Sequence, residues 1–446
     1  MSSVRTLLGL VAALAVVLVP AASGSTTGLS AATVPELAGI CEDVLEPITG
    51  GASASSEPLA VCQWDMLAIN ATASGSHAVA TGRGVKVGVL DSGVDMTHPD
   101  VAPNLDVAAS CSFIFSDTPT AHPQEIANGD CANKAAVQDL NGHGTHVASN
   151  IAAPVNGIGI AGVAPEATIV ALKVCTAVGF CFGDSVAAGL RKAGDLGLDV
   201  VNLSLFADPY LYYCGNDREQ RAMYQELQDA AKYAQQRGVV IVAAAGNETH
   251  DLQHPTTDVI SPDWPPDTAE ERIVRNNCRV APAEIPGVMT VSATGPLEIA
   301  SYSSVGMSAI DVAAPGGDYF AATGTVQDAV LGAWTSTDQE GTWDFFDGVL
   351  EPIFPGLTAV DGTARYIWIT GTSMASPHAA GIAALVRQLH PDWSPGAVIA
   401  AVTRTAQPLP CPELAEGDPR ERCYGGGGRT SFYGHGLVDA LAAASA

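Results

Sequence analysis

Short apolar runs alternate with helical patterns through the middle of this chain, and this alternation limits its fold more than any other feature. Near-continuous apolar runs predict strands at 84–90, 167–174, 199–205, 239–245 and 287–293. Amphipathic segments between them predict helices at 185–196 and 219–238. Strands that alternate with helices and are apolar along their whole length form parallel sheets buried on both faces. The sequence therefore predicts an α/β fold: a three-layer, doubly wound and mostly parallel sheet with helices on both faces.

Other segments extend this pattern. An Ala-rich segment predicts a short helix at 69–80, and residues 101–138 have the composition of a loop insert. A β-like run at 364–369 leads into a glycine turn, which is followed by a small-residue helix at 379–389. We find no internal repeat, so we expect one domain from residue 63 to residue 446.

Composition indicates a globular protein and excludes several partners. With 47% apolar and 15% charged residues, the 446-residue chain can bury a large core. Its 20 Lys and Arg residues stand against 47 Asp and Glu residues, which gives a net charge of −27. Such a surface does not attract DNA, RNA or an anionic membrane. The charge serves solubility or, alternatively, favours cationic substrates.

The first 25 residues have the three parts of a secretory signal peptide. Arg5 is the only charge, an apolar run extends from 7 to 19, and small residues follow at 21–25. The run is shorter than the roughly 20 residues of a transmembrane helix. The apolar C-terminal run, 437–444, is also too short and contains Asp439. We therefore expect a secreted protein with no membrane anchor.

Residues 26–62 form an N-terminal extension or a short pro-segment. This stretch is rich in Ser, Ala, Gly and Pro, and its apolar patches are too few for a core of its own. The ten cysteines of the chain suit an oxidising compartment, and none forms a Cys-x-x-Cys pair. Neighbouring cysteines fall in close couples, from which we predict five disulfides, although other connectivities stay open: Cys41–Cys62, Cys111–Cys131, Cys175–Cys181, Cys214–Cys278 and Cys411–Cys423. The first of these would tie the N-terminal segment to the domain behind it.

Three polar residues stand at points where strands end or helices begin. Asp91 follows the run 84–90, His143 stands between two glycines before a helix, and Ser373 stands where the glycine turn opens a helix. Taken alone, Asp91 is explained by an Asx turn and Ser373 by a helix N-cap. His143 and His146 are three residues apart and could bind a metal on one helix face, but no Glu lies between them as in His-Glu-x-x-His.

Together, an acid, an imidazole and a hydroxyl are the components of an acyl-transfer triad. A serine hydroxyl is a weak nucleophile near neutral pH and needs a base. Histidine, with an ordinary pKa of about 6.5, can accept and return a proton in that range. A buried carboxylate holds the correct histidine tautomer and stabilises the imidazolium. A helix that begins at the serine also offers unpaired backbone N–H groups to a developing oxyanion.

Three motifs resemble those of the subtilisin-like serine proteases, the subtilases of peptidase family S8. They are Asp91-Ser92-Gly93-Val94-Asp95, Asn141-Gly142-His143-Gly144-Thr145-His146 and Gly371-Thr372-Ser373-Met374-Ala375-Ser376-Pro377-His378. Their order, Asp then His then Ser, is that of the subtilisins. The resemblance covers residues 63–446 and implies a subtilisin-like peptidase domain: a secreted serine endopeptidase that cleaves polypeptides with Asp91, His143 and Ser373. It implies structural roles for Asp95 and His146, and no cofactor for catalysis.

The resemblance also implies which residues surround the reacting bond. Asn247 would bind the oxyanion through its side-chain amide, together with the backbone N–H of Ser373. Substrate would lie as an added strand against six further residues, namely Ser204, Leu205, Phe206, Ala244, Ala245 and Gly246. Phe206 stands where the family usually has glycine, which would narrow or reshape the pocket for the residue before the scissile bond.

A structural calcium site is implied where many subtilases bind Ca²⁺ through hard oxygen ligands. The ligands would be the side chains of Asp100 and Asn156 and the carbonyls of Pro154, Ile158 and Ile160. Upstream, residues 26–60 are too short for the folded pro-domain of many secreted subtilases. The protein would fold without one, or this segment would lie over the cleft as a plug.

The segment between Gly317 and Ala364 is longer than is usual in the family. It carries eight acidic residues, which would make the cleft acidic and favour basic or long substrates, or would belong to a solvated surface insert: Asp318, Asp328, Asp338, Glu340, Asp344, Asp347, Glu351 and Asp361. Two other functions compete with a protease: a catalytically silent binding protein on the same fold, and a lipase or esterase. The latter is disfavoured because Ser373 lacks the Gly-x-Ser-x-Gly context. We expect a monomer.

Overall fold

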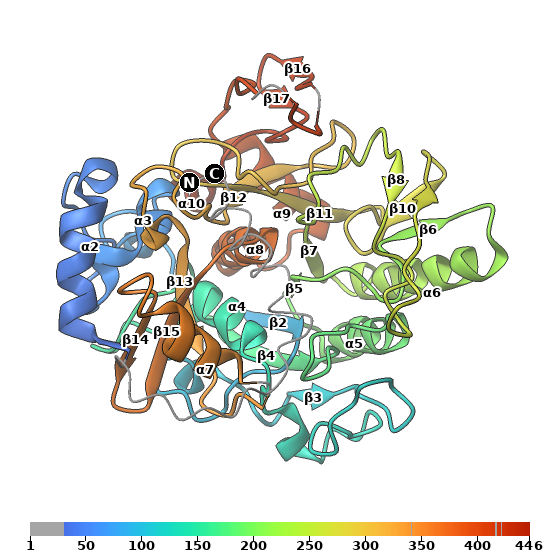
Figure 1. Cartoon of the computed structure of the whole chain (residues 1–446), viewed down its shortest axis with the longest axis horizontal. Helices are drawn as coiled ribbons and strands as arrows, with labels where there is room; N and C mark the ends of the chain where they lie inside the picture. The colour runs from blue at the N-terminus through green and yellow to red at the C-terminus, as the bar shows by residue number, and fades with distance from the viewer. Residues whose placement is uncertain (1–30, 340, 415–416, 421) are drawn as a thin grey trace.

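A seven-stranded parallel sheet forms the centre of the protein (Figure 1). The computed structural model describes residues 31–339, 341–414, 417–420 and 422–446, so the predicted signal peptide lies outside the described residues. All six strand pairings in this sheet are parallel. The strands are, in order across the sheet, β12 (Val312–Pro315), β11 (Val288–Thr294), β7 (Val240–Ala244), β5 (Val200–Leu203), β2 (Lys86–Asp91), β4 (Thr168–Lys173) and β3 (Cys111–Ser112).

Helices cover both faces of this sheet, which confirms the predicted three-layer α/β fold (Figure 1). α5 (Gly183–Leu196) and α6 (Arg218–Gln235) pack on one face, and α4 (His143–Ala152) and α8 (Thr372–Leu389) pack on the other. Adjacent strand residues point to opposite layers. In β2, Val89 packs into the core beside α4 and α8, whereas Leu90 packs into the core beside α5 and α6. Both faces of the strands are therefore apolar because both are covered.

A second sheet supports α4 from its other side. Its strands are, in order, β1 (Ala32–Thr33), β14 (Thr358–Asp361), β15 (Ala364–Ile369) and β13 (Val330–Trp334). β13 packs directly on α4, because a Cβ on Gly332 would lie 2.5 Å from the ring of His146. The long segment before Ser373 thus builds this sheet, with the short helix α7 (Thr342–Phe345) and the π-helical turn η6 (Phe346–Leu350) in the connection.

Two of the acidic residues in this segment are buried and bind backbone N–H groups. Asp328 accepts hydrogen bonds from the N–H groups of Ala322 and Thr323, and Glu351 accepts them from its own loop. Glu340 lies outside the described residues. Asp328 and Glu351 therefore serve the local fold rather than the charge of a cleft.

The N-terminal segment is part of the main core. α2 (Val34–Thr49) buries Leu37 and Leu45 in the same apolar cluster that contains β2, α4 and α8. The helix packs beside β14 and α3 (Trp64–Ala68), at an edge of the molecule (Figure 1). The interpretation of this stretch as a plug over the cleft is therefore wrong for α2, because its apolar face is buried in the core.

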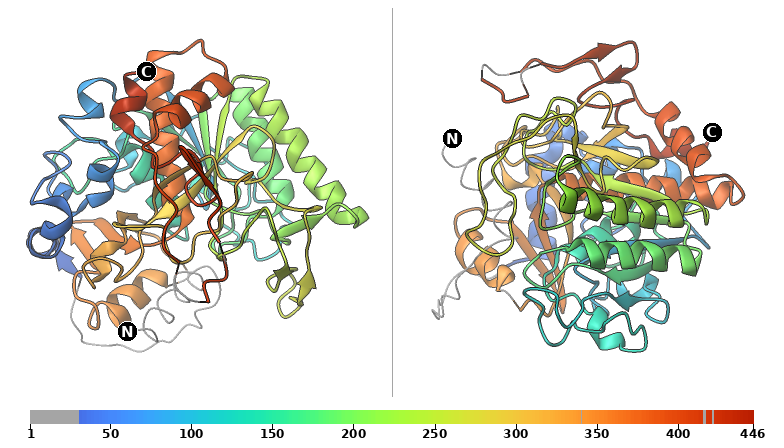
Figure 2. Two further views of the ribbon diagram at one scale, coloured as in Figure 1. Left: turned by 90° about the horizontal axis from the view of Figure 1, so that it is seen from above. Right: turned by 90° about the vertical axis from the view of Figure 1, so that its right-hand side faces the viewer.

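All five predicted disulfides are present, so each of the ten cysteines is paired. Cys214–Cys278 joins β6 (Tyr212–Cys214) to β10 (Cys278–Val280), which pair in antiparallel fashion. Residues 249–278, here called the arm, lead from β7 to this disulfide. The arm contains the hairpin of β8 (Thr257–Asp258) and β9 (Arg272–Ile273) and projects from one side of the central sheet (Figures 1 and 2).

The remaining elements lie around α8 and at the C-terminus. α9 (Pro395–Thr405) and α10 (Ala440–Ala444) pack beside α8. The glycine-rich hairpin of β16 (Gly425–Gly426) and β17 (Arg429–Thr430) projects from the surface (Figure 2). No helix in the described part of the chain has both the length and the apolar character that a membrane span requires.

One predicted helix is wrong. The Ala-rich composition of residues 69–80 favoured a helix, but α3 ends at Ala68 and only a short 3₁₀ turn, Ser76–Ala78, forms within this stretch. Asn70 has a φ of 58°, in the left-handed region, which stops the preceding helix. A local turn thus overrides the composition of the segment.

Candidate active site

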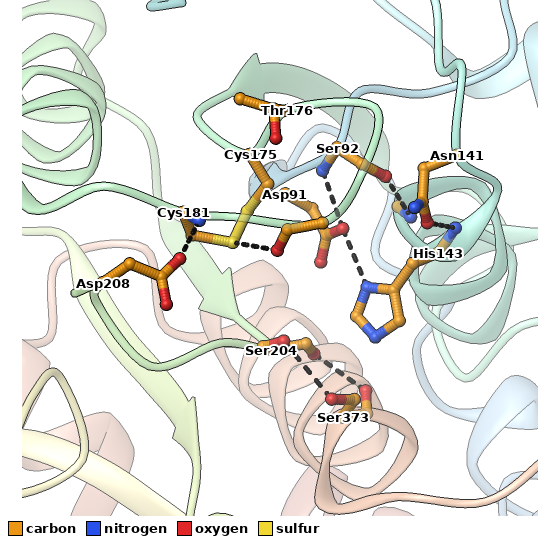
Figure 3. The surroundings of a disulfide bond; sticks show 12 residues. Asp91, Ser92, Asn141, His143, Cys175, Thr176, Cys181, Ser204, Asp208 and Ser373 are labelled. Atoms are coloured by element: carbon orange, nitrogen blue, oxygen red, sulfur yellow. Dashed lines mark hydrogen bonds and ion pairs between the residues drawn. A yellow bond between two sulfur atoms is a disulfide. The ribbon is translucent and has the colours of Figure 1, made fainter. Parts of the chain in front are cut away.

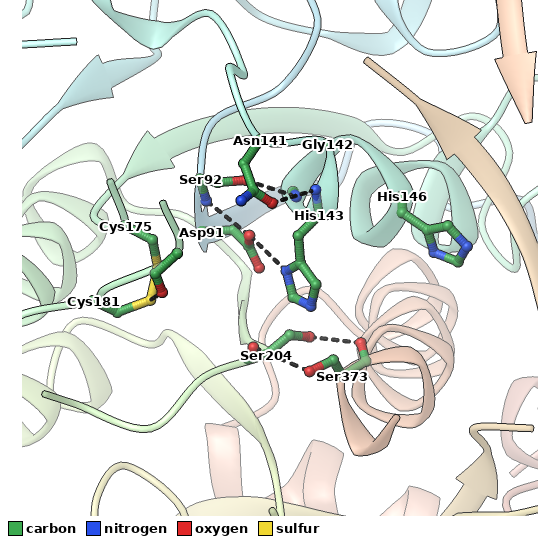
Figure 4. Close-up of polar contacts among 12 residues, drawn as sticks. Asp91, Ser92, Asn141, Gly142, His143, His146, Cys175, Cys181, Ser204 and Ser373 are labelled. Atoms are coloured by element: carbon green, nitrogen blue, oxygen red, sulfur yellow. Dashed lines mark hydrogen bonds and ion pairs between the residues drawn. A yellow bond between two sulfur atoms is a disulfide. The ribbon is translucent and has the colours of Figure 1, made fainter. Parts of the chain in front are cut away.

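The three residues of the predicted triad come from three elements that meet at one edge of the central sheet (Figure 4). Asp91 is the last residue of β2, His143 is the first residue of α4, and Ser373 is the second residue of α8. At this edge the carboxyl ends of the strands and the N-termini of the helices face the same space, as in other α/β proteins. The chain segments that carry the motifs are far apart in sequence, and the fold brings them together.

Asp91 and His143 are joined by a hydrogen bond. Nδ1 of His143 lies 2.8 Å from Oδ1 of Asp91, whose side chain is almost fully buried. Because a carboxylate accepts, Nδ1 carries the proton and leaves Nε2 free to act as a base. Burial of the ring opposes its protonation, but the charge and hydrogen bond of Asp91, with a smaller contribution from Asp139, raise the pKa of His143.

Ser373 lies below the free end of the His143 ring (Figure 4). In the described structure its hydroxyl donates a hydrogen bond to the carbonyl of Ser204 at 3.3 Å rather than to His143. Such bonds are often long or misaligned before substrate binds. Ser373 is half-buried and stands in the first turn of α8, where backbone N–H groups have no helical partner. Because Ser373 lies below the free end of the His143 ring, a rotation of its side chain would bring the hydroxyl toward the imidazole (Figure 4).

Asn247 faces the same turn and is held in one orientation by Thr372. The backbone N–H and the hydroxyl of Thr372 both donate to Oδ1 of Asn247, each at 2.9 Å. Since a backbone N–H can only donate, the oxygen of the amide faces Thr372 and the amide nitrogen points away from it. A Cβ on Gly371 would lie 3.7 Å from that nitrogen, which places the amide donor beside the Ser373 turn. Sequence analysis missed Thr372, although it precedes Ser373 in the motif.

A second residue that sequence analysis missed, Asp139, fixes the start of α4. Its buried carboxylate accepts hydrogen bonds from the N–H groups of Asn141, Gly142 and Thr145 and from the hydroxyl of Ser92. The same hydroxyl accepts the N–H of the residue after His143. Burial raises the pKa of Asp139. This network holds the turns that carry both members of the His–Asp pair.

The other histidine and aspartate of the motifs have different surroundings. His146 is fully buried against β13, and burial together with the nearby His143 lowers its pKa to about 3. Asp95 accepts hydrogen bonds from Thr97, Gln138 and Ser336, which outweigh the effect of burial and lower its pKa to about 2. Neither residue contacts Ser373, in keeping with the structural roles expected for them.

The predicted substrate-binding residues flank Ser373 on two segments. Ser204 is buried and its hydroxyl donates to the carbonyl of Ser373 at 2.8 Å. On the other segment, which contains Ala244 and Ala245, the N–H of Gly246 donates to the hydroxyl of Thr372 at 3.1 Å. Leu205 packs against the α5 and α6 core. Phe206 packs instead against a small apolar cluster between β6 and the arm, which includes Tyr212, Leu252 and Val274.

The disulfide Cys175–Cys181 stands beside the Asp–His pair (Figure 3). It closes a short loop between β4 and α5. The backbone N–H of Cys181 donates to the carboxylate of Asp208, which follows the substrate-binding segment. This loop therefore forms a fixed wall next to the predicted catalytic residues.

The residues predicted to bind calcium gather around one surface loop. Asp100 is buried, and its Oδ2 accepts hydrogen bonds from Ile160 N–H at 3.0 Å and from the hydroxyl of Tyr366 at 3.1 Å. Its Oδ1 has no partner in the described part of the chain. Burial raises the pKa of Asp100 to about 8. Asn156 turns its amide oxygen to the N–H of Ile158 within the loop.

Glu57, from the N-terminal segment, reaches the same loop. Its carboxylate lies close to the backbone of Asn156, Gly157 and Ile158, whose N–H groups partly offset the effect of burial on its pKa, and Oε2 is buried without a partner among the described residues. Burial raises the pKa of Glu57. Two buried carboxyl groups that each retain one unpaired oxygen fit the needs of a hard cation. Sequence analysis could not have found Glu57, because it is 43 residues away from Asp100 and in no motif.

Comparisons with known proteins agree with this geometry. A family model described as the subtilase family matches residues 82–436. Subtilisin Savinase of Lederbergia lenta is 32% identical over 381 residues, which cover 85% of this chain and 97% of that relative. Subtilisin E of Bacillus subtilis is 30% identical over 365 residues, which cover 82% of this chain and 66% of that relative.

Solved structures show the same fold. A protease of Pseudoalteromonas arctica PAMC 21717 is 26% identical, with a TM-score of 0.60, and the match covers 88% of this chain and 99% of that one. A lanthipeptide protease has a TM-score of 0.62 over 94% of this chain and 99% of its own, and at 23% identity this is a likeness of fold. The chain therefore belongs to the subtilase family and is a serine-type endopeptidase.

Proposed function

We propose that the chain is a secreted serine endopeptidase that cleaves peptide bonds through an acyl-enzyme on Ser373. One observation carries this proposal: Nδ1 of His143 is bound to Asp91 at 2.8 Å while the rest of the ring faces Ser373. This arrangement presents an imidazole with its proton on the correct nitrogen and its basic nitrogen toward the hydroxyl.

In the proposed reaction, Oγ of Ser373 attacks the carbonyl carbon of the scissile bond while Nε2 of His143 takes the hydroxyl proton. The oxyanion is bound by the amide nitrogen of Asn247 and the backbone N–H of Ser373. His143 then gives the proton to the leaving amine, the C–N bond breaks, and the acyl group stays on the serine. Water repeats these steps with His143 as its base. Asp91 stabilises the imidazolium in both halves of the reaction.

Two assays test this proposal. We expect a fluorophosphonate to label wild-type protein at one serine and an unstructured polypeptide to be cleaved, and Ser373→Ala to abolish both. Ser394→Ala is the matched control, because Ser394 is a helix N-cap whose hydroxyl accepts the N–H of Ala397 at the start of α9. It should cost about 0.5–2 kcal/mol of stability and keep labelling. Absence of label on folded wild-type protein would instead favour a catalytically silent binding protein.

We also propose that a structural calcium ion binds between Asp100 and Glu57. Their unpaired buried oxygens support this, and the carbonyls of Pro154, Ile158 and Ile160 in the same loop would complete the set of ligands. The ion would neutralise two buried carboxylates and tie the N-terminal segment to the domain; catalysis would not use it. We expect a chelator to lower the melting temperature and Glu57→Gln to reduce that shift. An unchanged melting temperature in chelator would rule the ion out.

Secretion and processing complete the proposal. The apolar run at 7–19 supports a signal peptide within residues 1–25. The net charge of −27 supports a monomer, because like charges repel one another. This monomer would act on polypeptides. N-terminal sequencing of secreted wild type and of Ser373→Ala tests whether the extension is trimmed by the protein itself. Different N-termini would indicate self-processing, whereas identical ones would exclude it.

A further inference from the structure

A buried ion pair that the proposed reaction does not use lies beside the Asp–His pair. Nζ of Lys173, the last residue of β4, is 3.0 Å from Oε2 of Glu125, and neither side chain is exposed to solvent. Lys173 is the register partner of Asp91 on the adjacent strand β2. Burying two charges costs free energy, so such a pair is a poor source of stability. We therefore explain it by what it holds in place.

Glu125 comes from the insert at 101–138, which is fixed to the edge of the central sheet. The disulfide Cys111–Cys131 closes the loop that contains Glu125. On β3, the hydroxyl of Ser112 donates to the backbone carbonyl of Glu125 at 2.7 Å. Because β3 pairs with β4, the insert delivers one carboxylate into the interior and holds it beside β4.

Lys173 connects the pair to the start of α4. Its Nζ also donates to the carbonyl of Gln138 at 3.0 Å. The next residue is Asp139, whose carboxylate accepts the N–H groups that begin this helix. Because N–H groups only donate, that arrangement needs Asp139 in its ionised form. The positive charge of Lys173 opposes the effect of burial on the pKa of Asp139 and so favours this form.

Glu125 connects the pair to His143 by a second route. Its Oε1 accepts the N–H of Ala177 at 3.2 Å, in the loop between β4 and α5. The carbonyl of Ala177 accepts the side-chain amide of Asn141 at 2.8 Å. The amide oxygen of Asn141 in turn accepts the backbone N–H of His143 at 3.1 Å (Figure 4). Two routes from one ion pair therefore converge on the residue that carries the predicted base.

We propose that Glu125 and Lys173 are positioning residues for His143. Their ion pair holds the turn before α4 and the loop between β4 and α5, so that the imidazole stays aligned between Asp91 and Ser373. This inference rests on the proposed endopeptidase function. Neither side chain is exposed, so neither can touch substrate. Loss of the pair should therefore slow turnover and leave substrate binding unchanged.

Turnover and labelling of Glu125 variants test the pair. Glu125→Gln keeps an acceptor for the N–H of Ala177 and removes the charge, whereas Glu125→Ala removes both. We expect kcat on a chromogenic peptide to fall by about 10²-fold in Glu125→Ala, the cost of a small misplacement at an active site, and by less in Glu125→Gln. KM should change little. The rate of fluorophosphonate labelling should fall with kcat, because labelling needs His143 but no peptide.

The double variant Glu125→Gln/Lys173→Met separates position from stability. Each single change leaves one buried charge unpaired and should lower the melting temperature, whereas the double variant leaves none unpaired. We expect the double variant to melt near wild type and still to have a low kcat, with a smaller loss than the two single changes predict together. It also serves if the single variants fail to fold.

Asp199→Asn is the matched control. Asp199 lies 4.0 Å from the buried guanidinium of Arg387 and accepts the N–H of Lys86 at the amino end of β2, the edge of the sheet opposite the predicted catalytic residues. This variant should keep kcat even if its melting temperature falls. The inference is overturned if the folded Glu125 variants or the double variant keep wild-type kcat, if they change KM alone, or if Asp199→Asn slows turnover equally. A wild type that neither cleaves peptide nor is labelled overturns the proposed function itself.

Discussion

Thr372→Val tests whether the orientation of Asn247 matters for turnover. The substitution keeps the shape of the side chain but removes its hydroxyl, which donates to Oδ1 of Asn247 at 2.9 Å and accepts the N–H of Gly246 at 3.1 Å. The backbone N–H of Thr372 still donates to Asn247, so the amide keeps its direction and loses only part of its support. We therefore expect a modest loss of activity.

The size of this loss follows from the contacts. A net hydrogen bond is worth about 0.5–1.5 kcal/mol, and each 1.36 kcal/mol of barrier is tenfold in rate, so kcat should fall roughly 2- to 13-fold. Removal of the donor itself, in Asn247→Ala, should cost on the order of 10²–10³ in kcat; that range was measured in a subtilisin. The KM should change little in both variants, because the oxyanion forms only during the reaction.

A double-mutant cycle of kcat on a chromogenic peptide provides the assay. In the Asn247→Ala background, Thr372→Val should have almost no further effect, because its partner is gone. Thr372→Ser, which restores the hydroxyl, should recover most of the activity. The reasoning is refuted if Thr372→Val costs as much in the absence of Asn247 as in its presence. A fall in melting temperature is expected as well, since the N–H of Gly246 loses its acceptor at a cost of about 1–3 kcal/mol.

Three further perturbations have defined outcomes. Asp91→Asn should lower kcat by about 10⁴-fold with little change in KM, because the wrong tautomer of His143 is favoured. Circular dichroism must show that the variant is folded, because an unfolded variant would lose activity for a reason other than the tautomer. Burial raises the pKa of both Asp208 and Asp263, so the folded state favours their protonated forms, and the stability this gives is complete at low pH and is lost as the pH rises through the raised values. Melting temperature should therefore fall toward alkaline pH, and Asp263→Asn should flatten that fall; equal slopes would contradict it. Leu37→Ala should cost about 2–5 kcal/mol in urea unfolding, because the side chain is fully buried; a near-zero cost would mean that α2 is dispensable.

Local sequence indicated most of the elements and the residues that we predict to react. Strand β2 was readable because its apolar run ends at an acidic residue, and Asp91, His143 and Ser373 each stand in a glycine-flanked motif. Four disulfides were readable because they join cysteines 6 to 21 positions apart, whereas Cys214 and Cys278 are 64 positions apart and meet because β6 pairs with β10. The helix expected at 69–80 was wrong for a local reason as well, since the left-handed turn at Asn70 carries little compositional signal.

Tertiary structure alone decided what surrounds those groups. The pairing of Thr372 with Asn247, of Glu57 with the loop of Asp100, and of Lys173 with Glu125 joins residues that are 43 to 125 positions apart. No periodicity or motif encodes such contacts, because they arise only when packed elements bring distant segments within a few ångströms. The sequence by itself therefore determined the chemistry that this protein can perform, whereas the packing of the insert at 101–138, the disulfide loop and α2 decided how that chemistry is oriented and stabilised.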